Sequence, residues 1–171
     1  MGVADCGYRH CSRTLGGELT GHSPVDRSKL GTKRSIITDG KGIPLGLILA
    51  AANENDNTLA EDTLDSLLAD RPEPTTDKPQ NFCADKGYDD KAVRQAGEDR
   101  KYIVHIRHRG QTDDLKPGEK KHPARRWVIE RTNSWHNRCR KLKIRYEKYA
   151  ENYVGLVEFA CCLIVYRQML N

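Results

Sequence analysis

Residues 34–51 read RSIITDGKGIPLGLILAA, and this stretch indicates the fold class of the chain. Arg34–Thr38 and Ile43–Ala51 are rich in Ile and Leu, which favours β-strands. The residues between them, Asp39-Gly40-Lys41-Gly42, are typical of the turn of a β-hairpin. Because the second strand is apolar on both faces, we expect it to lie centrally in a sheet.

Further strands and helices are expected on both sides of this hairpin. Upstream, residues 1–33 show little periodicity and predict one very short strand, Met1–Asp5, followed by a long loop. Downstream, apolar spacing and turn residues predict a helix over Asn57–Ala69, a strand over Asn81–Ala84, a helix over Asp90–Ala96 capped by Gly97, a strand over Lys101–Arg107, a polar loop over Gln111–Lys121, and helices over His122–Arg145 and Ala150–Leu170. This order predicts one α/β domain over residues 1–171, with a mixed central sheet flanked by helices.

The charge of the chain is unevenly distributed. Lys116–Lys148 holds 12 Lys and Arg residues against 3 acidic residues, a net charge of +9, which leaves −4 for the rest of a chain whose total is +5. A basic segment on an otherwise acidic chain suggests a polyanionic partner. The mean hydropathy of −0.76 and the lack of a long apolar run exclude a membrane protein.

The six cysteines point to an intracellular protein. None of them forms a C-x-x-C pair, and no histidine stands at zinc-finger spacing from two of them. We therefore expect buried free thiols in a reducing cytoplasm. The absence of a secretory signal in the sequence fits this expectation.

One carboxylate, Glu130, stands among cations and amides on the expected helix His122–Arg145. At 100° per residue, an apolar stripe should face the sheet, made by Val128, Thr132, Trp135, Cys139 and Leu142. Glu130 lies about 200° from Val128, on a polar face shared with Arg126, Asn133, Asn137 and Lys141. This arrangement suits a functional carboxylate, but it also suits an ordinary surface ion pair between Arg126 and Glu130.

Two further carboxylates end expected strands. Asp85 follows Asn81–Ala84 and precedes a glycine turn, which suits either a site at the carboxyl end of a strand or an ordinary turn residue. Asp5 ends the short first strand. Three carboxylates from distant positions can hold two divalent cations about 3.5–4 Å apart, and their hard oxygens suit Mg²⁺ or Mn²⁺. Such ions act on phosphodiesters, and the basic segment would help to bind that substrate.

Four blocks of the sequence share a pattern with a known family. They read GGELTGHSPVDRSKLGTKR at 16–34, DGKGIPL at 39–45 with Ala52-Asn53 and Asp56 following, ADKGYD at 84–89, and RRWVIERTNSW at 125–135 continuing to Arg138. In this order they resemble the DDE transposases of bacterial insertion sequences, specifically the group named insertion sequence five. The blocks cover nearly the whole chain.

The resemblance implies an RNase H-like fold with a five-stranded mixed sheet. It implies metal-dependent cleavage of DNA at the ends of the element and transfer of the freed strand into target DNA. It assigns the catalytic and metal-binding roles to Asp5, Asp85 and Glu130, which would hold two Mg²⁺ or Mn²⁺ ions. The partners would be the terminal inverted repeats, the target DNA and a second copy of the chain in a homodimer, in the bacterial cytoplasm with the nucleoid.

Several side chains are expected to contact DNA. Those on or after the Glu130 helix are Arg126, Arg131, Asn133, Arg138 and Lys141. Lys33 and Arg34, expected in the long first loop, could follow the DNA backbone or serve only solubility. Trp127 and Trp135 could stack on a base, although Trp135 falls within the apolar stripe and is expected in the core.

Two alternative functions are also considered, because the expected first catalytic strand stands at the very start of the sequence. Members of this family usually carry a helical region for end recognition before that strand, and we expect it to be absent here or encoded in an upstream frame. A catalytically inactive DNA-binding remnant of a transposase is therefore one alternative. An RNase H-like nuclease without a role in transposition is the other.

Overall fold

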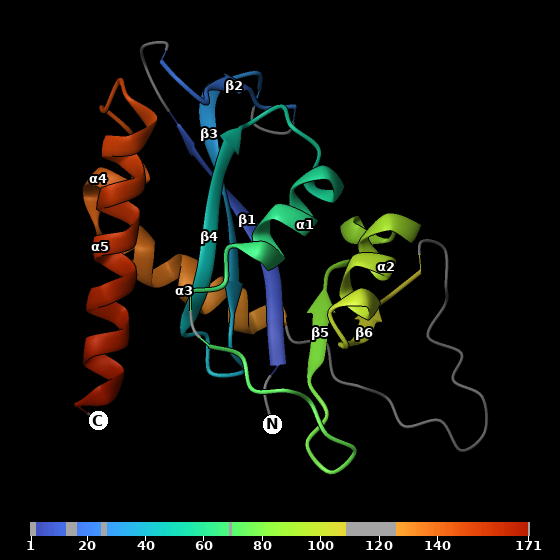
Figure 1. The fold of residues 1–171 in the computed structure, drawn as a ribbon. Helices are drawn as coiled ribbons and strands as arrows, with labels where there is room; N and C mark the ends of the chain where they lie inside the picture. The colour runs from blue at the N-terminus through green and yellow to red at the C-terminus, as the bar shows by residue number, and fades with distance from the viewer. Residues whose placement is uncertain (1–2, 13–16, 25–26, 69, 109–125, 171) are drawn as a thin grey trace.

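The computed structural model of the chain describes residues 3–12, 17–24, 27–68, 70–108 and 126–170, and it describes 3–12 and Arg126 by their backbone. The strands are β1 (Val3–Ser12), β2 (Gly21–His22), β3 (Leu30–Thr38), β4 (Pro44–Ala51), β5 (Asn81–Ala84) and β6 (Ile103–Ile106). The helices are α1 (Asp56–Asp65), α2 (Lys91–Asp99), α3 (Arg126–Arg138), α4 (Arg140–Lys143) and α5 (Ala150–Met169), with a 3-10 turn η1 (Lys86–Tyr88). The predicted mixed α/β class is confirmed (Figure 1).

The strands form one sheet with an antiparallel part and a parallel part. β3 pairs antiparallel with β1 and with β4, and the two-residue β2 adds a short pair at the start of β3. β1 pairs parallel with β5, and β5 pairs parallel with β6. The predicted hairpin is therefore β3–β4, but among the described strands β4 pairs with β3 alone, so it lies at an edge of the sheet and not centrally as expected. The first strand, β1, lies where the two parts of the sheet meet.

The first strand is longer than its sequence predicted. β1 pairs with β3 from Asp5 opposite Thr38 to Ser12 opposite Gly31, so the chain after Asp5 continues as a strand where a loop was expected. Residues 6–12, CGYRHCS, carry no clear alternation of apolar and polar residues. The long ladder with β3 supplies pairing that local sequence preference does not indicate.

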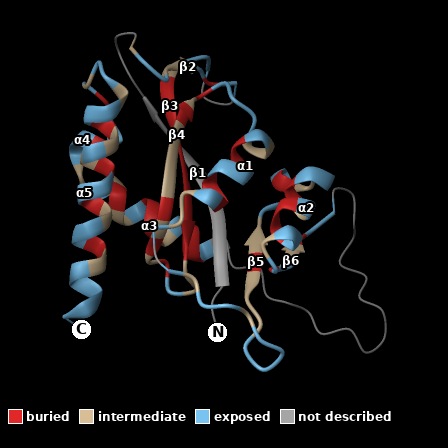
Figure 2. Ribbon diagram, in the orientation of Figure 1, coloured by how far each residue is buried: buried red, intermediate tan, exposed pale blue. Residues whose placement is uncertain are grey.

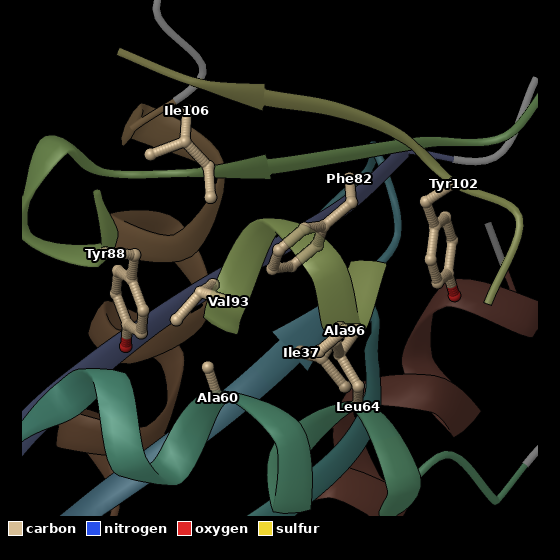
Figure 3. Close-up of a cluster of buried hydrophobic side chains, with 9 residues drawn as sticks. All are labelled: Ile37, Ala60, Leu64, Phe82, Tyr88, Val93, Ala96, Tyr102 and Ile106. Atoms are coloured by element: carbon tan, nitrogen blue, oxygen red, sulfur yellow. The ribbon is translucent and has the colours of Figure 1, made fainter. Parts of the chain in front are cut away.

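The larger apolar core lies between the sheet and the helices α1 and α2 (Figure 3). It is built from Ile37, Ala60, Leu64, Phe82, Tyr88, Val93, Ala96, Tyr102 and Ile106. Gly97 was predicted to cap the second helix, but it lies inside α2, which ends at Asp99. A Cβ atom at Gly97 would come within 2.7 Å of the Val104 side chain, so this glycine lets α2 approach β6 closely.

The helices α3, α4 and α5 cover the other face of the sheet (Figures 1 and 2). A second apolar core there contains Leu142, Tyr153, Val157 and Ala160. Leu163 lies on the exposed side of α5 with Phe159 and Tyr166. The reason is that only one side of this helix faces β4 and α4.

The long helix predicted over His122–Arg145 is divided into two helices, and 122–125 lie outside the described residues, as does the predicted loop Gln111–Lys121. α3 ends at Arg138, Cys139 has an extended backbone, and α4 begins at Arg140. The carbonyl oxygen of Leu142 accepts hydrogen bonds from Arg34 at 3.1 Å and from the Tyr153 hydroxyl at 3.0 Å. These bonds to β3 and α5 fix the chain after the break. No helix within the described residues combines the length and the apolar character needed to cross a membrane.

Candidate active site

Asp85 stands at the carboxyl end of β5 on a well-fixed turn. Its backbone is extended, and its side chain accepts a hydrogen bond from the backbone N–H of Lys86 at 2.7 Å, which caps η1. Tyr88, the last residue of η1, is buried in the larger core and anchors the turn. The result is an exposed carboxylate held at the end of a strand, as the sequence predicted.

The register of the sheet brings the first strand to the same place. β1 and β5 are parallel, with Asp5 opposite Cys83, two residues before Asp85. On its other side, Asp5 is opposite Thr38 of β3. A displacement of two residues along a neighbouring strand corresponds to roughly 8 Å between the two backbones. Asp5 and Asp85 therefore occupy neighbouring strands, two positions apart in register, with Asp85 at the carboxyl end of β5 and Asp5 within the longer β1.

Glu130 lies on α3, the helix that packs on β1 and β3. Its side chain is exposed, while Ile129 and Asn133 on the adjacent helix face are buried. Glu130 therefore stands at the edge of the helix face that covers the strand of Asp5. Among the side chains that the structure describes, no three His, Cys, Asp or Glu groups come together as a metal site, and Asp5 is outside that set.

The β3–β4 hairpin is fixed to α3 just after Glu130. The Thr132 hydroxyl donates to the carbonyl oxygen of Gly42 at 2.5 Å, and the Arg131 guanidinium donates to the carbonyl oxygen of Lys41. Gly42 has φ +79°, and a Cβ atom there would lie 3.0 Å from the Thr132 hydroxyl oxygen. The turn residues that predicted the hairpin thus also determine how closely it docks on the helix that carries Glu130.

Arg131 lies between two tryptophans on α3. Its guanidinium carbon is 4.8 Å from the centre of the Trp127 ring and 5.3 Å from that of the Trp135 ring, which are distances of cation–π contacts. Trp135 is half-buried, whereas Trp127 is 54% exposed. The sequence suggested Trp135 as a core residue, and the structure gives it the more buried position of the two.

Two predicted DNA contacts are overturned by their positions. Lys33 lies on β3 rather than in a loop, Arg34 lies on the same strand, and the two residues are only 5% and 0% exposed. Lys33 forms a 2.6 Å ion pair with Asp56, and Arg34 donates to Leu142 and, at 3.2 Å, to Asn137. Both cations are structural, because the strand β3 begins earlier than its polar sequence indicated and its two faces are covered by helices.

Of the other predicted DNA contacts, some are buried and some are exposed. Asn133 was expected on the polar face with Glu130, but it is 3% exposed, and its Oδ1 has no hydrogen-bond partner among the residues that the structure describes. The buried arc of α3 is wide because α3 packs against both the sheet and α5. Arg138 and Lys141 are exposed, although the break at Cys139 means that Lys141 does not continue the face of Glu130. The side chain of Arg126 lies outside the described ones.

A charged network beside Asp85 was missed in the sequence. Asp89 accepts a hydrogen bond from Arg94 at 2.8 Å and contacts His108 at 3.1 Å, and Arg94 also donates to the carbonyl oxygen of Ile106 at 2.7 Å. This network ties η1 to α2 and to the end of β6. Asp89 stands within the block ADKGYD, but its partners come from two other elements, so no local pattern could have indicated them.

A polar group is also buried between α3, β3 and α5. Burial, together with the nearby charge of Arg34, lowers the pKa of His136 from 6.5 to about 4. Its Nε2 lies 3.4 Å from the sulfur of Cys161, and burial raises the pKa of the Cys161 thiol to about 12. The described thiols are free, as predicted, but none of them is fully buried: Cys162 is exposed, and the other three, Cys83, Cys139 and Cys161, are half-buried.

Comparison with known proteins places the chain in a family. Residues 9–165 match the family described as "Transposase DDE domain". A protein of Burkholderia cepacia named "Putative transposase for insertion sequence element IS402" is 34% identical over 163 residues, which cover 92% of this chain and 74% of that protein.

A solved structure is more distantly similar. The "Cryo-EM structure of piggyBac transposase synaptic complex with hairpin DNA (SNHP)" matches with a TM-score of 0.45 and 13% identity, over 71% of this chain and 26% of the piggyBac chain. The family match and the insertion-sequence relative agree with each other and cover nearly the whole chain, so the protein belongs to the family of transposases with a DDE domain.

Proposed function

We propose that the chain is the catalytic domain of an insertion-sequence transposase of the insertion sequence five group. It would cut DNA at the ends of its element and join the freed 3′ end to target DNA. Its sheet, an antiparallel β4-β3-β1 part extended by the parallel strands β5 and β6, would be an RNase H-like core. We place its action in the bacterial cytoplasm, on nucleoid DNA.

One observation carries this proposal: the strand register that sets Asp5 beside Asp85, with the Glu130 helix packed on the strand of Asp5. This arrangement supports a common site for three carboxylates that are separated by 80 and 45 positions in the sequence. Structural ion pairing alone would not require acidic groups on three neighbouring elements. A site for a polyanionic substrate with bound cations would require them.

The donor set fits Mg²⁺ or Mn²⁺. Carboxylate oxygens are the ligands that these hard cations prefer, and the Asp85 carboxylate is exposed on a fixed turn. We propose that Asp5, Asp85 and Glu130 would hold two such ions. When bound, divalent ions lower the pKa of a nucleophilic water or 3′-hydroxyl and stabilise the leaving oxygen.

The residues around the carboxylates would bind and orient the DNA. Arg131 is held against the hairpin and between two rings, so its charge occupies a fixed place one residue from Glu130. Exposed Arg138 and Lys141 extend the positive surface beyond it, and we propose Arg126 as a further phosphate contact. We do not propose Lys33, Arg34 or Asn133 as DNA contacts, because their side chains are buried.

The proposal is tested by cleavage of DNA that carries the ends of the element. We expect nicking that requires Mg²⁺ or Mn²⁺, and its loss by at least a hundredfold in Asp85→Asn and in Glu130→Gln. Asparagine at position 85 can still accept the hydrogen bond from Lys86, so this variant removes the charge and keeps the cap. Glu151→Gln, which neutralises an exposed carboxylate on α5, is the matched control and should cleave normally.

The outcomes separate the alternatives. Cleavage that survives Asp85→Asn or Glu130→Gln would contradict the proposed site. Salt-sensitive DNA binding without any cleavage would identify an inactive remnant, and nicking without strand-transfer products would identify a nuclease. We also propose a homodimer, because two ends must be joined; sedimentation of the DNA complex would measure it.

A further inference from the structure

Trp127 is a large aromatic ring that the fold leaves exposed beside the proposed site. It lies in the first turn of α3, three residues before Glu130, and it is 54% exposed. Residues three apart on a helix have their Cβ atoms about 5–6 Å from each other. A group that stacked on Trp127 would therefore lie next to whatever Glu130 binds.

The ring is held in place by contacts on one side. The Arg131 guanidinium covers it at 4.8 Å, and Arg131 is itself fixed by the carbonyl oxygen of Lys41 and by the Trp135 ring. The support thus reaches from the β3–β4 hairpin through Arg131 to Trp127. A ring with a fixed orientation loses little conformational entropy when a flat ligand stacks on it.

The surroundings favour a nucleobase as that ligand. Every base offers a flat π-face, so stacking on an aromatic side chain does not depend on sequence. The guanidinium behind the ring adds positive charge that attracts the neighbouring phosphates. An apolar peptide would gain from the ring but not from the cation held against it.

We propose that Trp127 stacks on an unpaired nucleobase next to the scissile phosphate and so positions the DNA strand at the site. This inference rests on the proposed function, because it takes DNA as the substrate. Trp127 would contact the substrate as a positioning residue. Arg131 would act through it by fixing the ring.

Tryptophan fluorescence gives a direct test, because the chain contains only Trp127 and Trp135. In Trp135→Phe, the emission comes from Trp127 alone, and a phenylalanine ring still lies beside Arg131. Titration with a single-stranded oligothymidylate of 15 nucleotides, without metal, should quench this emission to saturation. The unmodified chain, titrated in parallel, should show partial quenching with the same affinity.

Trp127→Ala should weaken binding of the oligothymidylate by roughly 5- to 100-fold, the loss expected when one stacking ring is removed. The slope of log affinity against log salt should not change, because stacking releases no counterions from phosphates. Trp127→Phe should restore most of the affinity. Tyr146→Ala, which removes an aromatic side chain that is 70% exposed elsewhere, is the matched control and should bind normally.

The inference is overturned if the oligothymidylate does not bind, if it binds without quenching Trp127, or if Trp127→Ala binds as tightly as the unmodified chain. A changed salt slope in Trp127→Ala would also overturn it, because that result would show a loss of phosphate contacts. Failure of the proposed function gives a different result. The chain would then stack on single-stranded DNA, with quenching, but would not cleave DNA that carries the ends of the element.

Discussion

The Thr132 hydroxyl on α3 donates a 2.5 Å hydrogen bond to the carbonyl oxygen of Gly42 in the β3–β4 hairpin. The two residues are 90 positions apart, and the bond joins the turn of the hairpin to the helix that carries Glu130. Glu130 stands two residues before Thr132 on α3. Its place therefore depends on the docking of the hairpin as well as on its own helix. This link between the hairpin and α3 can be tested by a substitution that adds a single methyl group at Gly42.

Gly42→Ala should weaken the docking of the hairpin on α3. The added Cβ would meet the Thr132 hydroxyl oxygen at 3.0 Å, and φ +79° is strained for alanine. We expect the free energy of unfolding to fall by about 1–3 kcal/mol, measured by urea denaturation. Gly87→Ala is the control, because a Cβ atom there meets nothing within 4 Å. Equal stability of the two variants would show that the hairpin moves aside without cost.

Arg34→Met should destabilise the fold by roughly 2–4 kcal/mol, because it removes a hydrogen-bond donor from two acceptors, of which, within the described residues, only the first keeps another donor, the Tyr153 hydroxyl. The first acceptor is the carbonyl oxygen of Leu142, and the second is the side-chain oxygen of Asn137. Lys141→Met removes one exposed positive charge and serves as the control, with a change in stability below about 0.5 kcal/mol. Measured on folded protein at low temperature, we expect Lys141→Met to reduce DNA affinity and Arg34→Met to leave it nearly unchanged. If Arg34→Met reduced DNA affinity more than Lys141→Met, Arg34 would have to be counted among the DNA contacts.

Lys33 and Asp56 should prove energetically coupled. Their 2.6 Å ion pair joins β3 to the first residue of α1, and only 7% of the Lys33 side chain and 19% of the Asp56 side chain are exposed. Lys33→Met alone leaves the Asp56 carboxylate without this partner in a partly buried place, and it should cost roughly 2–4 kcal/mol. The double variant Lys33→Met, Asp56→Asn should be more stable than the sum of the two single effects predicts. Additive effects in this double-mutant cycle would mean that the pair contributes no net coupling.

Stability should fall at mildly acidic pH because of His136. The folded pKa of His136 is about 4, below its ordinary value of 6.5, because burial and then Arg34 disfavour the charged ring. The unfolded chain therefore takes up the proton first as the pH falls. The contribution of His136 to stability is complete above pH 6.5 and is progressively lost toward pH 4, by about 3 kcal/mol.

This pH dependence can be assigned by comparison of variants. Denaturant unfolding of His136→Leu between pH 7 and pH 4 should give a flatter profile than that of the unmodified chain. Profiles that remain parallel for His136→Leu and the unmodified chain would assign the acid sensitivity to other groups.

Local patterns in the sequence predicted those elements that carry strong signals of their own. The hairpin turn, the strand Asn81–Ala84, and the helices α1, α2 and α5 could be located because turn residues and apolar spacing act within one element. The prediction failed where a long-range partner decides the structure. The second half of β1, residues 6–12, is a strand because it pairs with β3, and the helix breaks at Cys139 where Leu142 accepts bonds from Arg34 and Tyr153.

The same division applies to the candidate site. Asp85 could be placed at a strand end from its own neighbours, and the resemblance to a transposase family named Asp5 and Glu130 beside it. The exposure of the cationic side chains was less predictable, because the sequence does not distinguish a lysine or arginine in a loop from one in a strand that helices cover. Lys33 and Arg34 therefore appeared to be DNA contacts, although β3 buries both. The network of Asp89, Arg94 and His108 could not be predicted, since it joins three elements.

By itself, the sequence supplied three candidate carboxylates, a basic segment before and around Glu130, and a resemblance to DDE transposases that the comparisons confirm at the level of the DDE transposase family. These are properties of residue types and of their order, which folding does not alter. Only the tertiary structure decided which strand lies beside which, and which cations remain at the surface. The register of β1 with β5 and the packing of α3 on the sheet are long-range relationships, set by burial and hydrogen bonding across the whole domain.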